Sequence, residues 1–203
     1  MKKILLFSAF AIFALTTAQS QEIRLGAKLG VNIASLGGDS YGFGSLGSRT
    51  SFHIGGLAEI PLMGKFALQP ELLYSSEGSN WSWGYGGDTN LDYIRIPVLA
   101  KYYIIEGLSA EAGPSFGLLM SAKMDGKDKL GEYDVKDLYK SFDVAFAIGA
   151  TYRLDMGVFF SLRYNKGLLN VRSNSNYYVD SSGYYSSVKN QSNVFQISAG
   201  YSF

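Results

Sequence analysis

The segment EIRLGAKLGVNIA (residues 22–34) alternates between two kinds of side chain without a break. Every second position is apolar, which gives one face made of Ile23, Leu25, Ala27, Leu29, Val31 and Ile33. The positions between them are charged, polar or glycine, namely Glu22, Arg24, Gly26, Lys28, Gly30 and Asn32. Because successive residues of a strand point to opposite faces, this pattern predicts a β-strand with one fully apolar face and one charged face.

The same alternation recurs along the chain, and helical periodicity is nearly absent. Further strands are predicted at 51–60, 66–77, 93–103, 108–120, 142–154, 158–167 and 195–203. Their apolar faces carry no charge in the central span, whereas the opposite faces mix charges of both signs with glycine and small residues. This favours a lipid-facing exterior around a cramped polar interior, because an Arg or Lys facing the bilayer midplane costs about 2–4 kcal/mol. Strands of roughly ten residues also suit a tilted membrane crossing.

The predicted connections alternate between long and short. Long loops are expected at 35–50, 78–92, 121–141 and 168–192, and tight turns at 61–65, 104–107 and 155–157. Outer-membrane barrels keep short turns in the periplasm and long loops outside, so both termini are expected in the periplasm. The sequence therefore predicts an all-β fold, an eight-stranded antiparallel up-and-down transmembrane β-barrel. Closure of such a barrel leaves no strand edge unpaired in lipid.

The N-terminus has the features of a secretory signal. Lys2 and Lys3 precede an apolar stretch at 4–15, and small residues follow it. This order predicts a signal peptide over 1–20, with the outer-membrane β-barrel domain over 21–203 and a final location in the bacterial cell outer membrane after cleavage. The chain has no cysteine, a formal net charge of +1 and no basic run, so a nucleic-acid partner is not expected.

Several stretches carry a resemblance to a known family. They are LDYIRIPVLAKYY, EAGPSFGLL, FAIGATYRL, LRYNKGLLNV and the terminal AGYSF, of which YIRIP and RYNKGL are the most specific. Together they resemble the porin-family outer-membrane β-barrel proteins, the PorT-like and OmpX-like eight-stranded barrels, over essentially the whole mature chain. The resemblance implies an eight-stranded barrel in the outer membrane and little about activity. Through PorT it also implies an accessory role in protein secretion as one alternative.

Charged residues on the inward faces predict a filled lumen. They are Arg24, Lys28, Glu59, Glu71, Glu77, Arg95, Lys101, Glu111, Asp143, Arg153 and Arg163. An eight-stranded barrel is just wide enough for its side chains, and unpaired charges there are costly. We therefore expect an ion-pair network that plugs the lumen, with a structural or recognition role for the barrel. A charged conduit, as in a narrow porin or transport channel, stays open as the alternative.

His53 is the only histidine and is expected to point into the lumen near the outer rim. Outer-membrane enzymes use a histidine at that height with Ser or Asp partners, and Ser51, Glu77 and Asp143 could be its neighbours. The chain has no recognisable nucleophile motif, so we expect no catalytic residue and interpret His53 as a hydrogen-bonded lumen residue. No cofactor or metal is expected, since the acidic stretch at 124–134 lacks calcium-loop spacing.

Two aromatic-rich stretches are candidates for binding. NWSWGYGG (80–87) and NSNYYVDSSGYYSSVKN (174–190) combine Tyr and Trp with small polar residues, as antibody paratopes do. The candidate residues are Trp81, Trp83, Tyr85, Tyr177, Tyr178, Tyr184 and Tyr185. The second stretch is also predicted to continue the last two strands of the barrel as a hairpin above the membrane, with its turn at 180–183. Expected partners are outer-membrane lipid, lipopolysaccharide and an extracellular or secretion-system protein.

The terminal segment FQISAGYSF (195–203) is predicted to be the last strand of the barrel. Its Tyr201 and Phe203 resemble the terminal aromatic signal that the barrel-assembly machinery reads. The strand is expected to close against the first one, which predicts a monomeric barrel.

Overall fold

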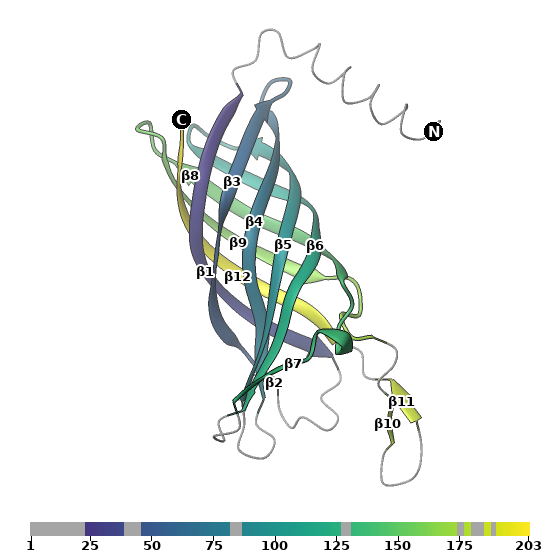
Figure 1. Ribbon diagram of the computed structural model, residues 1–203. Helices are drawn as coiled ribbons and strands as arrows, with labels where there is room; N and C mark the ends of the chain where they lie inside the picture. Colours follow the sequence, from purple (N-terminus) through teal and green to yellow (C-terminus); the bar gives the residue numbers. More distant parts are fainter. Residues whose placement is uncertain are drawn as a thin grey trace, which may run out of the picture.

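The computed structural model describes residues 23–38, 46–81, 87–126, 131–173, 177–179, 185–187 and 190–203 (Figure 1). The predicted signal peptide, residues 1–20, lies outside this described part. No helix among the described residues is long and apolar enough to cross a membrane.

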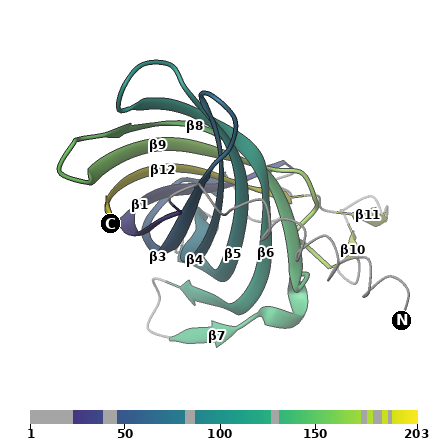
Figure 2. The same cartoon turned by 90° about the horizontal axis from the view of Figure 1, so that it is seen from above.

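Eight long strands form one closed antiparallel barrel, as the sequence predicts. They are β1 (Arg24–Gly38), β3 (Arg49–Pro61), β4 (Phe66–Trp81), β5 (Gly87–Tyr103), β6 (Leu108–Gly126), β8 (Phe142–Arg153), β9 (Val158–Gly167) and β12 (Asn190–Ser202). Each strand pairs with the next one along the chain, and β1 pairs with β12 to close the ring. Seen from above, β1 lies between β3 and β12 and the strands curve around one interior (Figure 2).

The two faces of the strands have the predicted orientation. Leu29 on β1 is 62% exposed on the outer surface, whereas its neighbour Lys28 is 2% exposed and points inward. Aromatic side chains pack against each other on the outside, with ring centroids 5.7 Å apart for Phe52 and Tyr74 and 5.0 Å apart for Phe66 and Tyr102. This exterior is the apolar band with aromatic residues towards its two edges that a lipid bilayer requires.

One end of the barrel carries the short turns and is called the inner end here. The turns contain Gly64, Gly107 and Gly157, each in the left-handed backbone region that glycine adopts at no steric cost. β1 begins and β12 ends at this same end, at the top of Figure 1. Because outer-membrane barrels place their short turns in the periplasm, the inner end is the one expected to face the periplasm.

The expected long loops at the opposite, outer end contain more strand than the sequence predicts. The expected long loop at 78–92 is mostly strand, because β4 continues to Trp81 and β5 starts at Gly87. The expected loop at 121–141 contains the end of β6, the short strand β7 (Glu132–Asp134) and the 3-10 turn η1 (Lys136–Leu138). β7 pairs with β6, and β2 (Leu46–Gly47) pairs with β4.

A simple physical reason explains the longer strands. Outside the bilayer both faces of a hairpin can carry polar residues, so the backbone pairing continues where the apolar alternation stops. Gly78 pairs with Asn90 and Asn80 with Asp88 in this extension of β4 and β5. The Ser, Gly and Asn residues in this stretch were therefore wrongly interpreted as a loop.

The predicted hairpin near the C-terminal end of the chain is present as a separate two-stranded sheet. β10 (Tyr177–Val179) pairs with β11 (Tyr185–Ser187), with Tyr177 opposite Ser187. The predicted turn residues 180–183 lie outside the described residues. Among the described residues this small sheet does not pair with the barrel strands, so it is not the predicted continuation of the last two strands.

Candidate functional site

The middle of the lumen is crossed by an ion-pair cluster, the central cluster, made of Lys28, Glu71, Glu111 and Arg163. Arg163 donates from Nη1 and Nη2 to the two carboxylate oxygens of Glu71, both at 2.8 Å, and from Nε to Glu111 at 2.8 Å. Lys28 Nζ lies 3.1 Å from Glu71 Oε2. All four side chains are buried, and their two positive and two negative charges balance.

A second cluster lies towards the outer end. Arg95 forms a two-bonded pair with Glu77, through Nε at 2.8 Å and Nη2 at 2.7 Å, and Nη2 is also 2.7 Å from Asp143 Oδ2. Ser75 and Ser192 donate their hydroxyls to the same Glu77 carboxylate. The guanidinium therefore links three strands, β4, β5 and β8, inside the barrel.

A third cluster, the inner-mouth cluster, gathers around one carboxylate. Glu59 accepts hydrogen bonds from Lys101 at 2.8 Å, Arg24 at 3.1 Å and Arg153 at 3.3 Å, and from the Tyr103 hydroxyl at 2.6 Å. Glu59 is buried, but the Arg24 and Arg153 side chains are 37% and 23% exposed. This set is not balanced, because three cations share one carboxylate.

These three clusters contain every charged lumen residue that the sequence singled out. Neutral residues on the predicted polar faces complete them: Gln69 donates to Glu71 and accepts from Lys101, and Thr151 donates to Glu111. The sequence missed apolar residues that point inward, including Leu57, Leu73, Leu99 and Phe159. These apolar residues lie in phase with the charged positions of their strands, so the two-residue period would have found them.

His53 points into the lumen as expected, but its neighbours differ from the suggested ones. It is fully buried, with Nδ1 2.7 Å from Asn32 Oδ1 and Nε2 2.8 Å from Ser198 Oγ. Ser51, Glu77 and Asp143 do not bond to its ring, because Ser51 donates to the Ser76 carbonyl and the two acids belong to the Arg95 cluster. A histidine held by an amide and a hydroxyl is a structural link between β1, β3 and β12.

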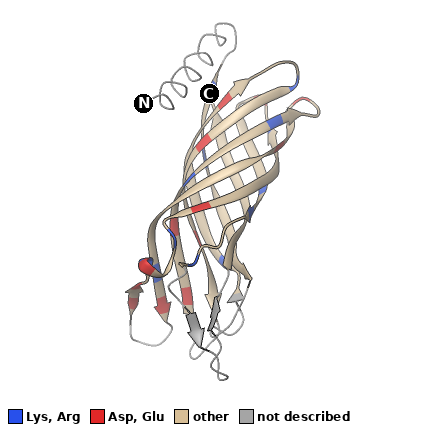
Figure 3. Ribbon diagram, turned by 90° about the vertical axis from the view of Figure 1, so that its right-hand side faces the viewer, with Lys and Arg blue, Asp and Glu red and all other residues tan. Residues whose placement is uncertain are grey.

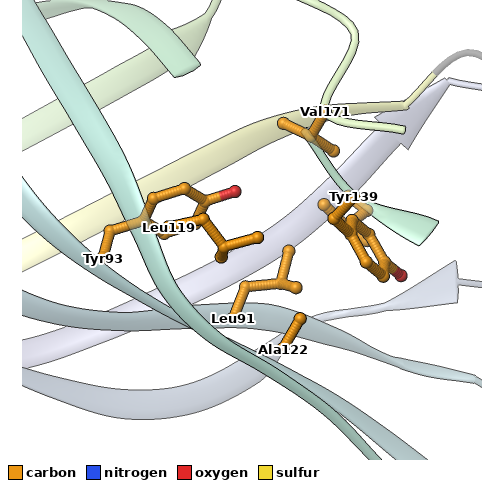
Figure 4. Close-up of a cluster of buried hydrophobic side chains, with 7 residues drawn as sticks. Leu91, Tyr93, Leu119, Ala122, Tyr139 and Val171 are labelled. Carbon is orange, nitrogen blue, oxygen red and sulfur yellow. The ribbon is translucent and has the colours of Figure 1, made fainter. Parts of the chain in front are cut away.

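The outer end of the lumen is covered by an apolar cap that the sequence did not predict. The cap consists of Leu36, Leu91, Tyr93, Leu119, Ala122, Tyr139 and Val171. Tyr139 and Val171 come from the connections after η1 and β9, and they lie over the strand residues Tyr93, Leu91 and Leu119 (Figure 4). Burial raises the pKa of the Tyr139 phenol above its ordinary value, so the ring stays neutral there.

Backbone hydrogen bonds fix the two covering segments to each other and to the barrel. Lys140 N–H donates to the Val171 carbonyl at 2.8 Å, and Val171 N–H donates to the Asn190 carbonyl at 2.8 Å. Val135 N–H donates to Ala122 on β6 at 2.9 Å. The cap is therefore an ordered part of the barrel end.

Little space remains inside the barrel. One cavity of about 10 Å³ lies between Lys28, Gln69 and Arg163, and another of about 10 Å³ lies beside Glu77, Arg95 and Gln196. A cavity needs roughly 10–15 Å³ to hold one water molecule. The inner mouth is wider, with two concavities of about 390 Å³ and 450 Å³ that share Arg24 and Arg153.

The candidate binding aromatics are not gathered into one described patch. Trp81 ends β4 opposite Gly87, whereas Tyr177 and Tyr178 lie in β10 and Tyr185 begins β11. Trp83, Tyr85 and Tyr184 fall outside the described residues.

The outer end carries mixed charge with acidic segments, visible at the lower end of Figure 3. Its charged residues include Asp88, Asp125, Glu132, Asp134, Asp137, Lys123, Lys136 and Lys140. Among the described residues no three His, Asp or Glu side chains lie close enough to hold a metal ion.

The assembly-signal candidates lie on the outside of the barrel at its inner end. Tyr201 is 47% exposed and Phe203 is 75% exposed, with their ring centroids 5.5 Å apart. Phe203 N–H donates to the Leu25 carbonyl at 2.8 Å, so the last residue still pairs with β1.

The family model of the outer membrane protein beta-barrel domain matches residues 17–173. The chain belongs to this family. Membership agrees with the closed barrel, its apolar exterior and its charged interior, and it places the protein in the outer membrane. No curated protein sequence is significantly similar to the chain.

Solved structures of other outer-membrane barrels share the fold. Neisserial surface protein A (NspA) has a TM-score of 0.53 at 12% identity, over 91% of this chain and 100% of that chain. Ail, the attachment invasion locus protein of Yersinia pestis, has a TM-score of 0.51 at 14% identity, over 90% and 99%. At these identities the similarity concerns the barrel architecture.

Proposed function

We propose that this protein is a closed, non-conducting outer-membrane barrel that carries recognition surfaces at its outer end. The observation that carries the proposal is the double closure of the lumen. The central cluster fills the middle of the barrel, and the apolar cap covers its outer end. Passage of a solute would require several buried ion pairs to break and the cap to move, which is costly in a low-dielectric interior.

The outer end offers features that suit binding. Trp81 ends β4 at the connection to β5, and two of the three residues of β10 are tyrosines. Such rings supply rigid contact area at low entropy cost, and small polar residues around them adapt to a partner. The partner classes we propose are a protein or glycan on a facing surface, together with the lipopolysaccharide around the barrel.

The charged residues at the outer end restrict the chemical class of partner that can bind there. Ail has been solved in complex with the heparin analogue sucrose octasulfate. In the present chain, acidic residues at 125 and 132–137 face the same side as Lys123 and Lys136. A strongly sulfated polyanion would be repelled by these acids, so we propose a neutral or cationic partner surface.

Site-specific photo-crosslinking in intact outer membranes tests the proposal. A photoreactive phenylalanine at Trp81 or Tyr185 should give discrete protein or glycan adducts, and one at Met63 in an inner turn provides the control. Adducts that are no stronger than those at Met63 would reject a recognition role for the outer end.

A further inference from the structure

The inner end of the barrel forms a concave site that faces the periplasm. Two adjoining concavities of about 390 Å³ and 450 Å³ share Arg24, Glu106, Gly107 and Arg153 in their lining. Volumes of a few hundred Å³ are typical of small-ligand sites. Two cavities among the lumen side chains, by comparison, measure about 10 Å³ each.

Basic and acidic side chains meet at this mouth. Arg24, Lys101 and Arg153 all bond to the single carboxylate of Glu59, so this cluster has two more cations than carboxylates. Lys65 adds a further cation to the lining, and Glu106 and Asp155 add two carboxylates, which leaves these side chains with one net positive charge. Positive charge beside a cavity attracts anions, and low-dielectric walls strengthen that attraction.

Hydrogen-bond donors remain available at the same place. Arg24 and Arg153 each use Nη1 to bond Glu59, which leaves their Nε and Nη2 groups without a partner among the described residues. Guanidinium groups bind carboxylates and phosphates through two parallel hydrogen bonds. Two partly exposed guanidiniums around one cavity can therefore hold one oxyanion between them.

The rim restricts the size and shape of the ligand. Glu106 and Asp155 on two turns line the concavities and would repel an extended polyanion. Ile105, Phe66, Leu154 and Phe203 also line the openings and suit a short apolar group. The lining therefore fits a small molecule or chain end with one oxyanion head.

We infer that the inner mouth is a binding site for a single carboxylate or phosphate group, held by Arg24 and Arg153. The oxyanion has two possible sources on the periplasmic side: the carboxylate of a soluble peptide or small acid, or the phosphate of a phospholipid headgroup in the inner leaflet. This site lies at the opposite end from the proposed recognition surface and stands independently of it.

Solution NMR of the refolded barrel tests the inference with defined probes. N-acetyl-alanyl-alanine with a free carboxylate is titrated into the barrel in a nonionic detergent, and its C-terminal amide serves as the neutral control. The Nε–H signals of Arg24 and Arg153 should shift with the acid alone, while that of Arg49 at the outer end stays fixed. A second arm follows the same signals in nanodiscs of phosphatidylglycerol and compares them with those in the nonionic detergent, which carries no phosphate.

A double variant, Arg24→Gln with Arg153→Gln, should weaken binding at least about tenfold, because a hydrogen bond to a charged group is worth about 1.5–3 kcal/mol. Glu59 keeps Lys101 and Tyr103 in this variant, so the barrel should fold. Lys123→Gln with Lys136→Gln removes the same two charges at the outer end and should leave binding unchanged. A matched single variant, Arg24→Gln, provides the test if the double variant does not fold.

Each outcome bears on the inference. The variants lack the substituted Nε–H groups, so the backbone amide of Gly107, which lines both concavities, reports binding in them. Shifts with the acid alone identify a soluble carboxylate, and shifts in phosphatidylglycerol discs alone identify a lipid phosphate, provided that the arginine substitutions abolish the shift of Gly107. If neither probe shifts Arg24 and Arg153, or if the double variant binds as tightly as the wild type, the inference is overturned.

Discussion

Arg163 on β9 and Glu71 on β4 face each other across the full width of the barrel and share two parallel hydrogen bonds of 2.8 Å. Three strands separate β4 from β9 in either direction around the ring. The pair therefore acts as a strut through the lumen between opposite walls. Lys28 on β1 and Glu111 on β6 bond to this pair from the other two sides of the ring. The ion pairs inside the lumen therefore contribute to the stability of the barrel.

Removing the carboxylate of this strut should destabilise the barrel strongly. Glu71→Ala leaves Arg163 with Glu111 alone and Lys28 without its ion-pair partner, and breaking a buried pair in this way costs about 3–5 kcal/mol. Urea unfolding of the barrel in lipid vesicles, followed by tryptophan fluorescence, measures the loss. Glu132→Gln at the exposed Lys123 pair is the control and should have little effect. Equal stability of the two variants would contradict a structural role for the strut.

A methyl group at Gly30 should interfere with barrel closure. A Cβ atom there would lie 2.7 Å from His53 Cε1 and closer still to the Ile197 carbonyl oxygen of β12. Gly30→Ala should therefore destabilise the β1–β12 seam by about 1–3 kcal/mol, as overpacking does. Gly56→Ala is the matched control on the outer face, where the nearest atom, Gly26 O, is 3.7 Å away. The heat-dependent shift in gel mobility reports the folded fraction, and identical midpoints for the two variants would count against this packing.

A charge on the lipid-facing surface should be costly only within the apolar band. Leu29 lies near the middle of the outward face of β1 and is 62% exposed. Leu29→Arg should reduce the unfolding free energy in lipid vesicles by about 2–4 kcal/mol. Met63→Arg, in an exposed inner turn, should change it little. If both variants unfold at the same urea concentration, the lipid-facing apolar band does not include Leu29.

The terminal aromatic should matter for assembly in cells more than for stability. Phe203 is exposed at the inner end, and its ring packs against Tyr201. We expect Phe203→Ser to lower the amount of folded protein in outer membranes well below that of Phe66→Ser, another outward-facing phenylalanine at the same end. Both purified variants should refold in detergent to similar extents. Parallel losses in cells and in detergent would show that Phe203 acts through stability and not through the assembly machinery.

The barrel strands and the inward direction of their polar side chains were predictable from the sequence, because both follow the two-residue alternation. Lys28, Glu71 and Arg163 are each in phase with the polar positions of their strands, which is enough to place them in the lumen. Their pairing was not predictable, since Glu71 and Arg163 are 92 positions apart and meet only because of the ring's size and stagger. The partners of His53 escaped prediction for the same reason.

The apolar cap could not be predicted from the alternation of apolar and polar residues. Tyr139 and Val171 belong to connections without periodicity, and they reach the lumen through backbone hydrogen bonds between two segments far apart in the sequence. The loop predicted at 78–92 failed for a related reason, because strands above the bilayer no longer need an apolar face. The strands continue to pair there, although the sequence no longer alternates between apolar and polar residues.

Single-channel recording in planar lipid bilayers tests the central claim most directly. The refolded barrel should produce no steady conductance steps, because ion-pair clusters cross the lumen and the two cavities among their side chains measure about 10 Å³ each. Glu71→Ala, which breaks the strut, serves as the comparison and should give unstable openings that the wild type lacks. Stable, reproducible open states of the wild-type barrel would contradict a closed lumen and favour a channel.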